Sequence, residues 1–154
     1  NGADIILGVP TMVVALLEAQ EKRPRDLSAL KLVSCGGSMV APELVRRVQN
    51  LMGAGFSTLY GQTEHCPVIT QHHLSDSIDD ICNTAGQPVA QTEVSIRSVD
   101  DNSAVAVGEV GEICARGPCV MLEYNDNPEA TSETVDEGGW LHTGDLGGWM
   151  RAGM

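Results

Sequence analysis

The sequence predicts an α/β fold in its first half and a mainly β fold in its second half. In the first half, short apolar segments that end in glycine alternate with amphipathic helical segments, which is typical of a parallel sheet. In the second half, apolar and polar residues alternate over short stretches that are separated by turn residues. We therefore predict that residues 1–71 form the end of an α/β subdomain. Residues 72–154 form a small β-rich subdomain, a barrel or a sandwich, and both belong to one truncated domain.

Two helices and two strands are predicted in the first half. Proline in the first turn and apolar residues at helical spacing predict helices over residues 10–22 and 42–52. A glycine directly after the second helix suits a left-handed C-cap. Apolar runs at 30–34 and 56–60 predict strands that lead into glycine turns, and a shorter apolar run occupies residues 4–7.

Short strands and turns are predicted in the second half. Residues 72–86 are polar and predict a loop or a short excursion of the chain. Strands are predicted at 94–97, 105–107 and 113–115, with aspartate- and glycine-rich turns between them. One helix is predicted to begin at Asn127-Pro128, where asparagine can cap the helix and proline suits the first helical position.

The composition indicates a globular protein with an acidic second half. The chain has 154 residues, of which 42% are hydrophobic and 19% are charged, and its formal net charge is −12. Residues 1–75 carry six acids and six basic residues, whereas residues 76–154 carry fifteen acids and only three arginines. This balance disfavours binding to nucleic acid or to anionic lipid. No apolar run reaches the roughly 18 residues of a transmembrane segment, and we expect a cytoplasmic protein.

The five cysteines are predicted to be reduced thiols. Their number is odd, no two of them form a CxxC pair, and the four histidines do not supply metal ligands at short spacing. A zinc site is therefore not predicted, and buried free thiols of a cytosolic protein are the favoured interpretation. Neither end of the chain has the pattern of a natural terminus, so the sequence is interpreted as an internal piece of a longer enzyme.

Three segments in a fixed order carry the functional signal. They are YGQTE at residues 60–64, GEICARG at 111–117 and GWLHTGD at 139–145. Together they resemble segments of the acyl-CoA synthetases, which belong to the adenylate-forming (AMP-binding) superfamily. The resemblance extends over nearly the whole chain, through GVPTM, SCGGSMVAPELVRRV, GQPVAQTEVSI and LEYNDNPEATSETV. It implies the end of an α/β subdomain followed by a distorted β-barrel, within a large N-terminal domain.

The resemblance implies a role for each residue of the first motif. Tyr60 would stack on adenine, Gly61 would form the turn beside the nucleotide, and Thr63 would donate to the α-phosphate of ATP. Glu64 would bind Mg²⁺, for which one carboxylate plus phosphate oxygens is sufficient. Thr63 and Glu64 would thus be catalytic. The structural alternatives stay open, since a tyrosine at a strand end is ordinary core and Thr-Glu after a glycine is a common helix cap.

The remaining implied residues lie on two other loops. Gly36, Gly37 and Ser38 would let the backbone approach the adenine and the acyl substrate without a Cβ clash. Asp145 would accept hydrogen bonds from both ribose hydroxyls, on a tight Thr-Gly-Asp turn. A plain strand–helix turn and a plain turn aspartate are the respective alternatives. Arg116 is assigned to structure, where it would tether a loop.

The implied reaction joins a carboxylic acid, which the resemblance suggests is a fatty acid, to ATP. Acyl-adenylate and pyrophosphate form first, and CoA then displaces AMP, so ATP, Mg²⁺ and CoA are the expected cofactors and co-substrates. Two alternatives remain: a different acceptor, as in peptide-synthetase adenylation domains or luciferase-like enzymes, and a non-catalytic nucleotide-binding or interaction remnant. The chain has no phosphate-binding loop, and its two lysines precede every motif. We therefore expect the 154 residues alone to be inactive.

Overall fold

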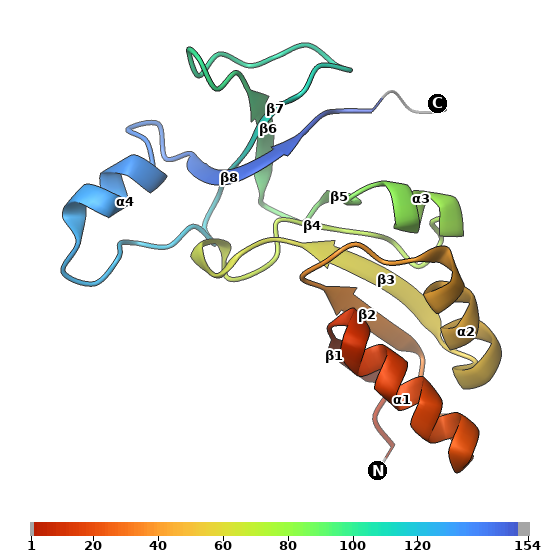
Figure 1. Cartoon of the computed structure of the whole chain (residues 1–154). Helices are drawn as coiled ribbons and strands as arrows, with labels where there is room; N and C mark the ends of the chain where they lie inside the picture. The colour runs from red at the N-terminus through yellow and green to blue at the C-terminus, as the bar shows by residue number, and fades with distance from the viewer. Residues whose placement is uncertain (1, 151–154) are drawn as a thin grey trace. The chain divides into compact units, whose positions relative to one another are not determined.

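The computed structural model describes residues 2–150, whose helices and strands are labelled in Figure 1. By their contacts they divide into two compact units. The first unit contains the residues up to Gly61 together with Thr70–Gln87. The second contains Gln62–Ile69 together with the residues from Pro88 onward. One sheet contains parallel strands and the other is small and antiparallel, so the predicted fold class is confirmed.

The first sheet has five strands in the order β1-β2-β3-β4-β5. The first three are parallel to their neighbours, and β4 is antiparallel to β3. Their bounds are β1 Ile5–Gly8, β2 Leu32–Gly36, β3 Gly55–Tyr60, β4 Thr70–Gln71 and β5 Gln87–Pro88. The two strands predicted in this half are thus confirmed, and the short apolar run at residues 4–7 forms a further strand.

Three helices accompany this sheet: α1 Pro10–Lys22, α2 Pro42–Met52 and α3 Ile78–Asn83. The first two begin at a proline, as predicted, and Gly53 closes α2 in the left-handed conformation with φ 66°. Apolar side chains of the three helices and of β2 and β3 form the core of the unit. Its fully buried members include Val13, Leu17, Val33, Cys35, Val45, Val48 and Phe56.

The helix α3 lies in a segment that we predicted as a loop. Ser77 caps it, because its hydroxyl accepts a hydrogen bond from the amide of Asp80 while the Asp80 carboxylate accepts one from the amide of Ser77. Ile81 and Cys82 are buried against the core. A six-residue helix is too short to show a clear helical period in the sequence, so the prediction missed it.

The second unit contains the antiparallel sheet β6-β7-β8. Its elements are β6 Glu93–Arg97, β7 Gly111–Arg116, β8 Leu141–Gly147, the helix α4 Pro128–Thr134 and the 3₁₀ helix η1 Thr63–His65. The strands predicted at 94–97 and 113–115 are confirmed, as is the start of α4, where the Asn127 side chain accepts a hydrogen bond from the amide of Ala130.

Two expectations for this unit were wrong. Within the described residues of the unit the strands form an open three-stranded sheet, too few to close into the barrel that the resemblance implied. Residues 105–107 are not a strand, since Ala104 makes only an isolated bridge to Arg97, and Val107 is 52% exposed beside the turn glycine Gly108. Because residues 105–107 lack a partner strand along their length in the part of the chain that the structure describes, their alternating pattern does not form a strand.

The segment 141–147 forms a strand instead of the predicted turn. Gly144 interrupts it with φ +74°, and the register between β7 and β8 is irregular between Glu112 and Cys114. The Thr-Gly-Asp sequence therefore makes a bulge inside β8. None of the described helices has the length and apolar composition needed to cross a bilayer.

Candidate functional site

In the first unit, the structure brings two of the predicted loops to one edge of the sheet. Gly36 ends β2 and Tyr60 ends β3, and the parallel register places Gly36 opposite Leu59. The segments that follow both strands, which include Gly37, Ser38 and Gly61, therefore leave the sheet at the carboxyl ends of its strands. Open α/β sheets bind their ligands at this edge.

Gly36 and Gly37 are glycines for different structural reasons. A Cβ on Gly36 would lie 2.5 Å from Cδ1 of Leu59 and 3.1 Å from the Leu59 carbonyl oxygen, so packing inside the sheet requires a glycine. Gly37 has φ +82°, and among the described residues a Cβ there would meet only the Val9 side chain, at 3.7 Å. Packing therefore explains the glycine at position 36, whereas position 37 has open space; close approach of a ligand to Gly36 and Gly37 stays a prediction.

In the second unit, Thr63 and Glu64 lie on η1, with Thr63 exposed and Glu64 half-buried. The Tyr124 hydroxyl donates to Oε1 of Glu64 at 2.8 Å, and the Met121 amide donates to the Glu64 carbonyl at 2.7 Å. In the described chain no side chain caps η1 at Gln62, so the capping alternative has no support there. The segment 121–124 therefore holds the Glu64 carboxylate in place.

Tyr124 is a site residue that the sequence analysis did not single out. The hydrogen bond to Glu64 and partial burial raise the pKa of its phenol above the ordinary value, so Tyr124 remains a donor at neutral pH. The LEYNDNPEAT segment signalled the family but not this contact, because Tyr124 and Glu64 lie 60 residues apart.

Asp145 is exposed and follows the bulge of β8. The Asp145 amide donates to Oγ1 of Thr143 at 3.1 Å, and that hydroxyl donates to the carbonyl of Ile113 at 2.7 Å. The Gly144 amide donates to Oε1 of Glu112 at 2.9 Å. These three bonds fix the backbone that carries the Asp145 carboxylate relative to β7.

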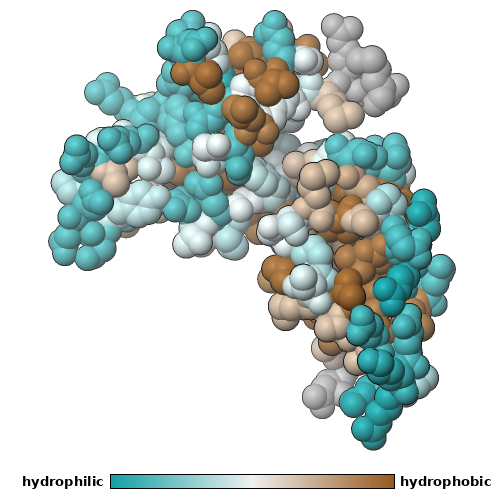
Figure 2. Space-filling view, viewed as in Figure 1, coloured by the Kyte–Doolittle hydropathy of each residue, from teal (hydrophilic) through white to brown (hydrophobic). Residues whose placement is uncertain are grey.

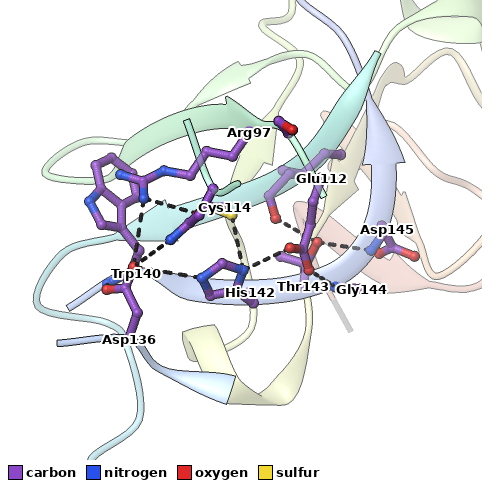
Figure 3. Close-up of polar contacts among 12 residues, drawn as sticks. Arg97, Glu112, Cys114, Asp136, Trp140, His142, Thr143, Gly144 and Asp145 are labelled. Carbon is purple, nitrogen blue, oxygen red and sulfur yellow. Dashed lines mark hydrogen bonds and ion pairs between the residues drawn. The ribbon is translucent and has the colours of Figure 1, made fainter. Parts of the chain in front are cut away.

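A polar network surrounds the same part of the sheet (Figure 3). Nδ1 of His142 lies 2.7 Å from Oε2 of Glu112 and 3.6 Å from Sγ of Cys114, and Nε2 of His142 lies 3.6 Å from Oδ2 of Asp136. Burial, reinforced by the Glu112 carboxylate, raises the pKa of Cys114 to about 11. The sequence analysis missed this network because it did not predict β8.

Asp136 connects this network to Trp140. Its Oδ1 accepts hydrogen bonds from the amides of Gly138 and Trp140, at 2.8 and 2.9 Å. Burial alone would raise the pKa of Asp136, but these hydrogen bonds and the nearby Arg97 guanidinium hold it below the ordinary value. Asp136 is therefore a charged acceptor.

Two arginines flank the ring of Trp140. The guanidinium carbons of Arg97 and Arg116 lie 4.4 and 4.5 Å from the ring centroid, within cation–π range. Arg116 also forms an ion pair with Glu93 at 2.7 Å and donates to the Gly138 carbonyl at 3.4 Å. The prediction that Arg116 tethers a loop is confirmed.

All five cysteines are free. Three are buried, as predicted, whereas Cys119 is half-buried and Cys66 is exposed. A hollow of about 310 Å³ in the first unit does not involve the predicted site residues. It is lined by Ile6, Leu16, Ala19, Gln20, Arg25, Leu27 and Met52.

The predicted site residues belong to different units. Tyr60 and the glycine loop belong to the first unit, and Thr63, Glu64 and Asp145 belong to the second.

Comparison with known proteins identifies the family. The family model described as AMP-binding enzyme matches residues 1–125, which is most of the chain. The chain belongs to the AMP-binding enzyme family. The resemblance noted from the motifs is thereby confirmed.

The relatives include several acyl-CoA ligases. The chain is 40% identical over 139 residues to a long-chain-fatty-acid–CoA ligase of Salmonella typhimurium, covering 90% of the chain and 24% of that protein. It is 37% identical over 145 residues to luciferin 4-monooxygenase of Luciola mingrelica, covering 92% of the chain and 26% of that protein. The chain spans about a quarter of the length of the curated relatives it matches.

Solved structures agree on the fold. The structure of O-succinylbenzoate coenzyme A synthetase from Bacillus subtilis, in complex with AMP, matches with a TM-score of 0.82 and 29% identity. The match covers 97% of this chain and 30% of that one. The fold of this chain is therefore similar to that of a solved coenzyme A synthetase.

Proposed function

We propose that this chain carries part of the active site of an acyl-CoA synthetase. ATP would activate a carboxylic acid to an acyl-adenylate, and CoA would then take the acyl group. Membership of the AMP-binding family and the CoA-ligase relatives support this reaction class. The observation that carries the proposal is Glu64, a half-buried carboxylate on η1 that Tyr124 holds through one oxygen only.

The residues around Glu64 fit a magnesium ion. Tyr124 occupies Oε1, and in the described part of the chain no hydrogen bond to Oε2 is present, so this oxygen can face a cation. Mg²⁺ prefers one or two carboxylates together with phosphate oxygens and water. When bound, it would neutralise the charge that develops on the phosphates of ATP. Because the Tyr124 phenol stays protonated, it orients the carboxylate without adding charge.

The other predicted residues would bind the nucleotide. Thr63, which is exposed beside Glu64, would donate to the α-phosphate. Asp145 would accept hydrogen bonds from the ribose hydroxyls, since its backbone is fixed by Thr143 and by the Gly144 bond to Glu112. Tyr60 would stack on the adenine, with Gly37 giving the ligand room beside it.

The identity of the molecule that accepts the acyl group is the more specific part of the proposal. The relative from Luciola mingrelica is a monooxygenase, so a luciferase-like enzyme is the second candidate. The CoA-ligase relatives favour CoA, and the Salmonella relative suggests a fatty acid as substrate.

A cytoplasmic location and the absence of nucleic-acid partners remain part of this proposal, supported by the acidic second half. The division into subdomains at residue 71 also stays a prediction.

Glu64→Gln in the full-length protein tests the proposal. The variant keeps the size of the side chain and its contact with Tyr124, but it removes the charge that would hold Mg²⁺. We expect carboxylate-dependent pyrophosphate exchange to fall roughly 100-fold or more, and the Mg²⁺ requirement to rise. Glu133→Gln, an exposed acid on α4, is the matched control. Unchanged exchange and unchanged Mg²⁺ dependence in Glu64→Gln would rule out this role of Glu64.

A further inference from the structure

Three potential metal ligands converge where β7 meets β8. Glu112 and Cys114 are two residues apart on β7, and His142 is the direct partner of Cys114 across the antiparallel pair. One ligand atom of each residue lies within 4.8 Å of the others. Figure 3 shows the three side chains pointing toward one another between the two strands. These residues are distinct from Glu64, the proposed magnesium ligand.

We infer that Glu112, Cys114 and His142 form a binding site for a thiophilic divalent cation of the zinc class. Thiolate, imidazole and carboxylate are the donors that zinc prefers, whereas Mg²⁺ and Ca²⁺ prefer oxygen alone. Nδ1 of His142 lies 3.6 Å from Sγ of Cys114 and 2.7 Å from Oε2 of Glu112, so these atoms need only small movements to face one ion. The cation takes the place of the proton between Nδ1 and Oε2.

The surrounding bonds already orient two of the ligands. Oε1 of Glu112 accepts the amide hydrogen of Gly144, which leaves Oε2 for the cation. Asp136 lies 3.6 Å from Nε2 of His142, on the opposite side of the ring from the proposed ion. At 3.6 Å this carboxylate attracts the ring electrostatically, and a small approach would let it accept the Nε2 proton and orient the metal-bound histidine. Because β7 and β8 are paired strands, the ligands sit on a rigid support.

The local charges are compatible with a divalent ion. Arg97 is close to the site, but its guanidinium lies over Trp140 and pairs with Asp136 at 3.6 Å. Ionised Cys114, Glu112 and Asp136 together offset Arg97 and the cation. The side chains of Glu112 and His142 are 18% and 23% exposed, so the ion can enter from solvent and keep a water molecule as a further ligand.

Binding must displace protons. Coordination by the Cys114 thiolate requires the cation to exchange for the thiol proton, which leaves to solvent with the proton shared by His142 and Glu112. This requirement excludes hard cations that bind sulfur weakly. The site therefore predicts selectivity for Zn²⁺ or Co²⁺ over Mg²⁺.

Cobalt binding to the purified full-length protein tests the inference. A thiolate bound to Co²⁺ gives a charge-transfer absorption band in the near ultraviolet, and Zn²⁺ should remove this band by displacement. We expect one equivalent of Co²⁺ per chain and no effect of excess Mg²⁺. Cys114→Ser should abolish the band. Cys82→Ser, at another buried thiol, and Cys66→Ser, at the exposed thiol, are the matched controls and should retain it.

Two further variants keep the test decisive if Cys114→Ser does not fold. His142→Asn and Glu112→Gln change partly exposed side chains, and each should weaken Co²⁺ affinity about tenfold or more. Far-ultraviolet circular dichroism checks that each variant is folded. The inference is overturned if folded wild type shows no thiolate band at millimolar Co²⁺. It is also overturned if the band survives Cys114→Ser, if Cys66→Ser abolishes it, or if His142→Asn and Glu112→Gln both retain wild-type affinity.

Discussion

The two units of the molecule are stabilised in different ways. The large hydrophobic cluster belongs to the first unit, where apolar side chains of α1, α2, β2 and β3 are buried together. In Figure 2 the visible face of this unit carries broad brown regions, whereas the second unit is mostly teal and white with smaller brown groups. The second unit buries few large apolar side chains, and a network of carboxylates, arginines and Trp140 connects its strands.

The difference between the two units corresponds to the distribution of charge along the sequence. The first 75 residues are balanced in charge, and the rest carry the whole negative excess. Among the described residues of the second unit, both arginines are paired: Arg97 with Asp136 and Arg116 with Glu93, and both lie against Trp140. Hydrophobic burial is insensitive to pH, whereas a network of charges depends on pH and salt. The two units should therefore respond to different kinds of mutation.

The largest expected effect is a cavity in the first unit. Phe56 is 2% exposed on β3 and lies in the hydrophobic cluster. Phe56→Ala should lower the free energy of unfolding by about 3–5 kcal/mol, because it removes apolar contacts and leaves a cavity. Urea unfolding measures the change. Leu122→Ala is the control, since Leu122 is 97% exposed and should change stability by no more than about 0.5 kcal/mol. Equal effects of the two variants would contradict the comparison.

In the second unit, the next largest effect is expected at Asp136. Asp136→Ala leaves the amides of Gly138 and Trp140 without their acceptor and Arg97 without its ion pair. We expect a loss of about 2–3 kcal/mol, measured by urea unfolding at low and high salt. The loss should be smaller at high salt, because part of it is electrostatic. Asp100→Ala, at an exposed turn, is the control, and a similar loss there would show that acidic side chains in general stabilise the unit.

A smaller effect is expected at the contact between Tyr124 and Glu64. Tyr124→Phe in the full-length protein removes the hydrogen bond to Glu64 and leaves the fold intact. Because Glu64 is half-buried, water can replace part of this bond, and we expect the apparent affinity for Mg²⁺ in the adenylation reaction to fall about tenfold. Thermal unfolding of the same variant separates a local effect from a loss of stability. An unchanged Mg²⁺ requirement would show that Tyr124 does not position the carboxylate.

The smallest effect concerns an exposed carboxylate of the first unit, Asp80. The hydroxyl and the amide of Ser77 hold the pKa of Asp80 below its ordinary value of 3.8. The ionised carboxylate therefore adds stability above pH 3.8, and this contribution is lost as the pH falls through the lower pKa of the folded state. Asp80→Asn should flatten the acid limb of the stability profile slightly, and Ser77→Ala should do the same. A profile identical to that of wild type in both variants would exclude this contribution.

Local signals in the sequence were sufficient for several elements. Proline at the first position and an asparagine cap located the starts of α1, α2 and α4, because these signals act on the backbone within a few residues. Apolar runs located β2 and β3, and alternation located β6 and β7. The order of the motifs along the chain was sufficient to indicate the family, and the family model confirms it.

Long-range contacts decided the rest. The short helix α3, the strand β8 and the failure of residues 105–107 to form a strand all depend on which segments pack or pair with them. A pattern within one segment does not contain that information.

The same distinction applies to the site. The sequence indicated which residues are candidates for nucleotide and magnesium binding, since the residues within each motif are close together along the chain. Only the tertiary structure showed that Tyr124 holds Glu64, that Leu59 explains Gly36, and that Glu112, Cys114 and His142 converge. The physical reason is that strand pairing and loop contact join residues many positions apart, and the register of that pairing is set by the whole sheet.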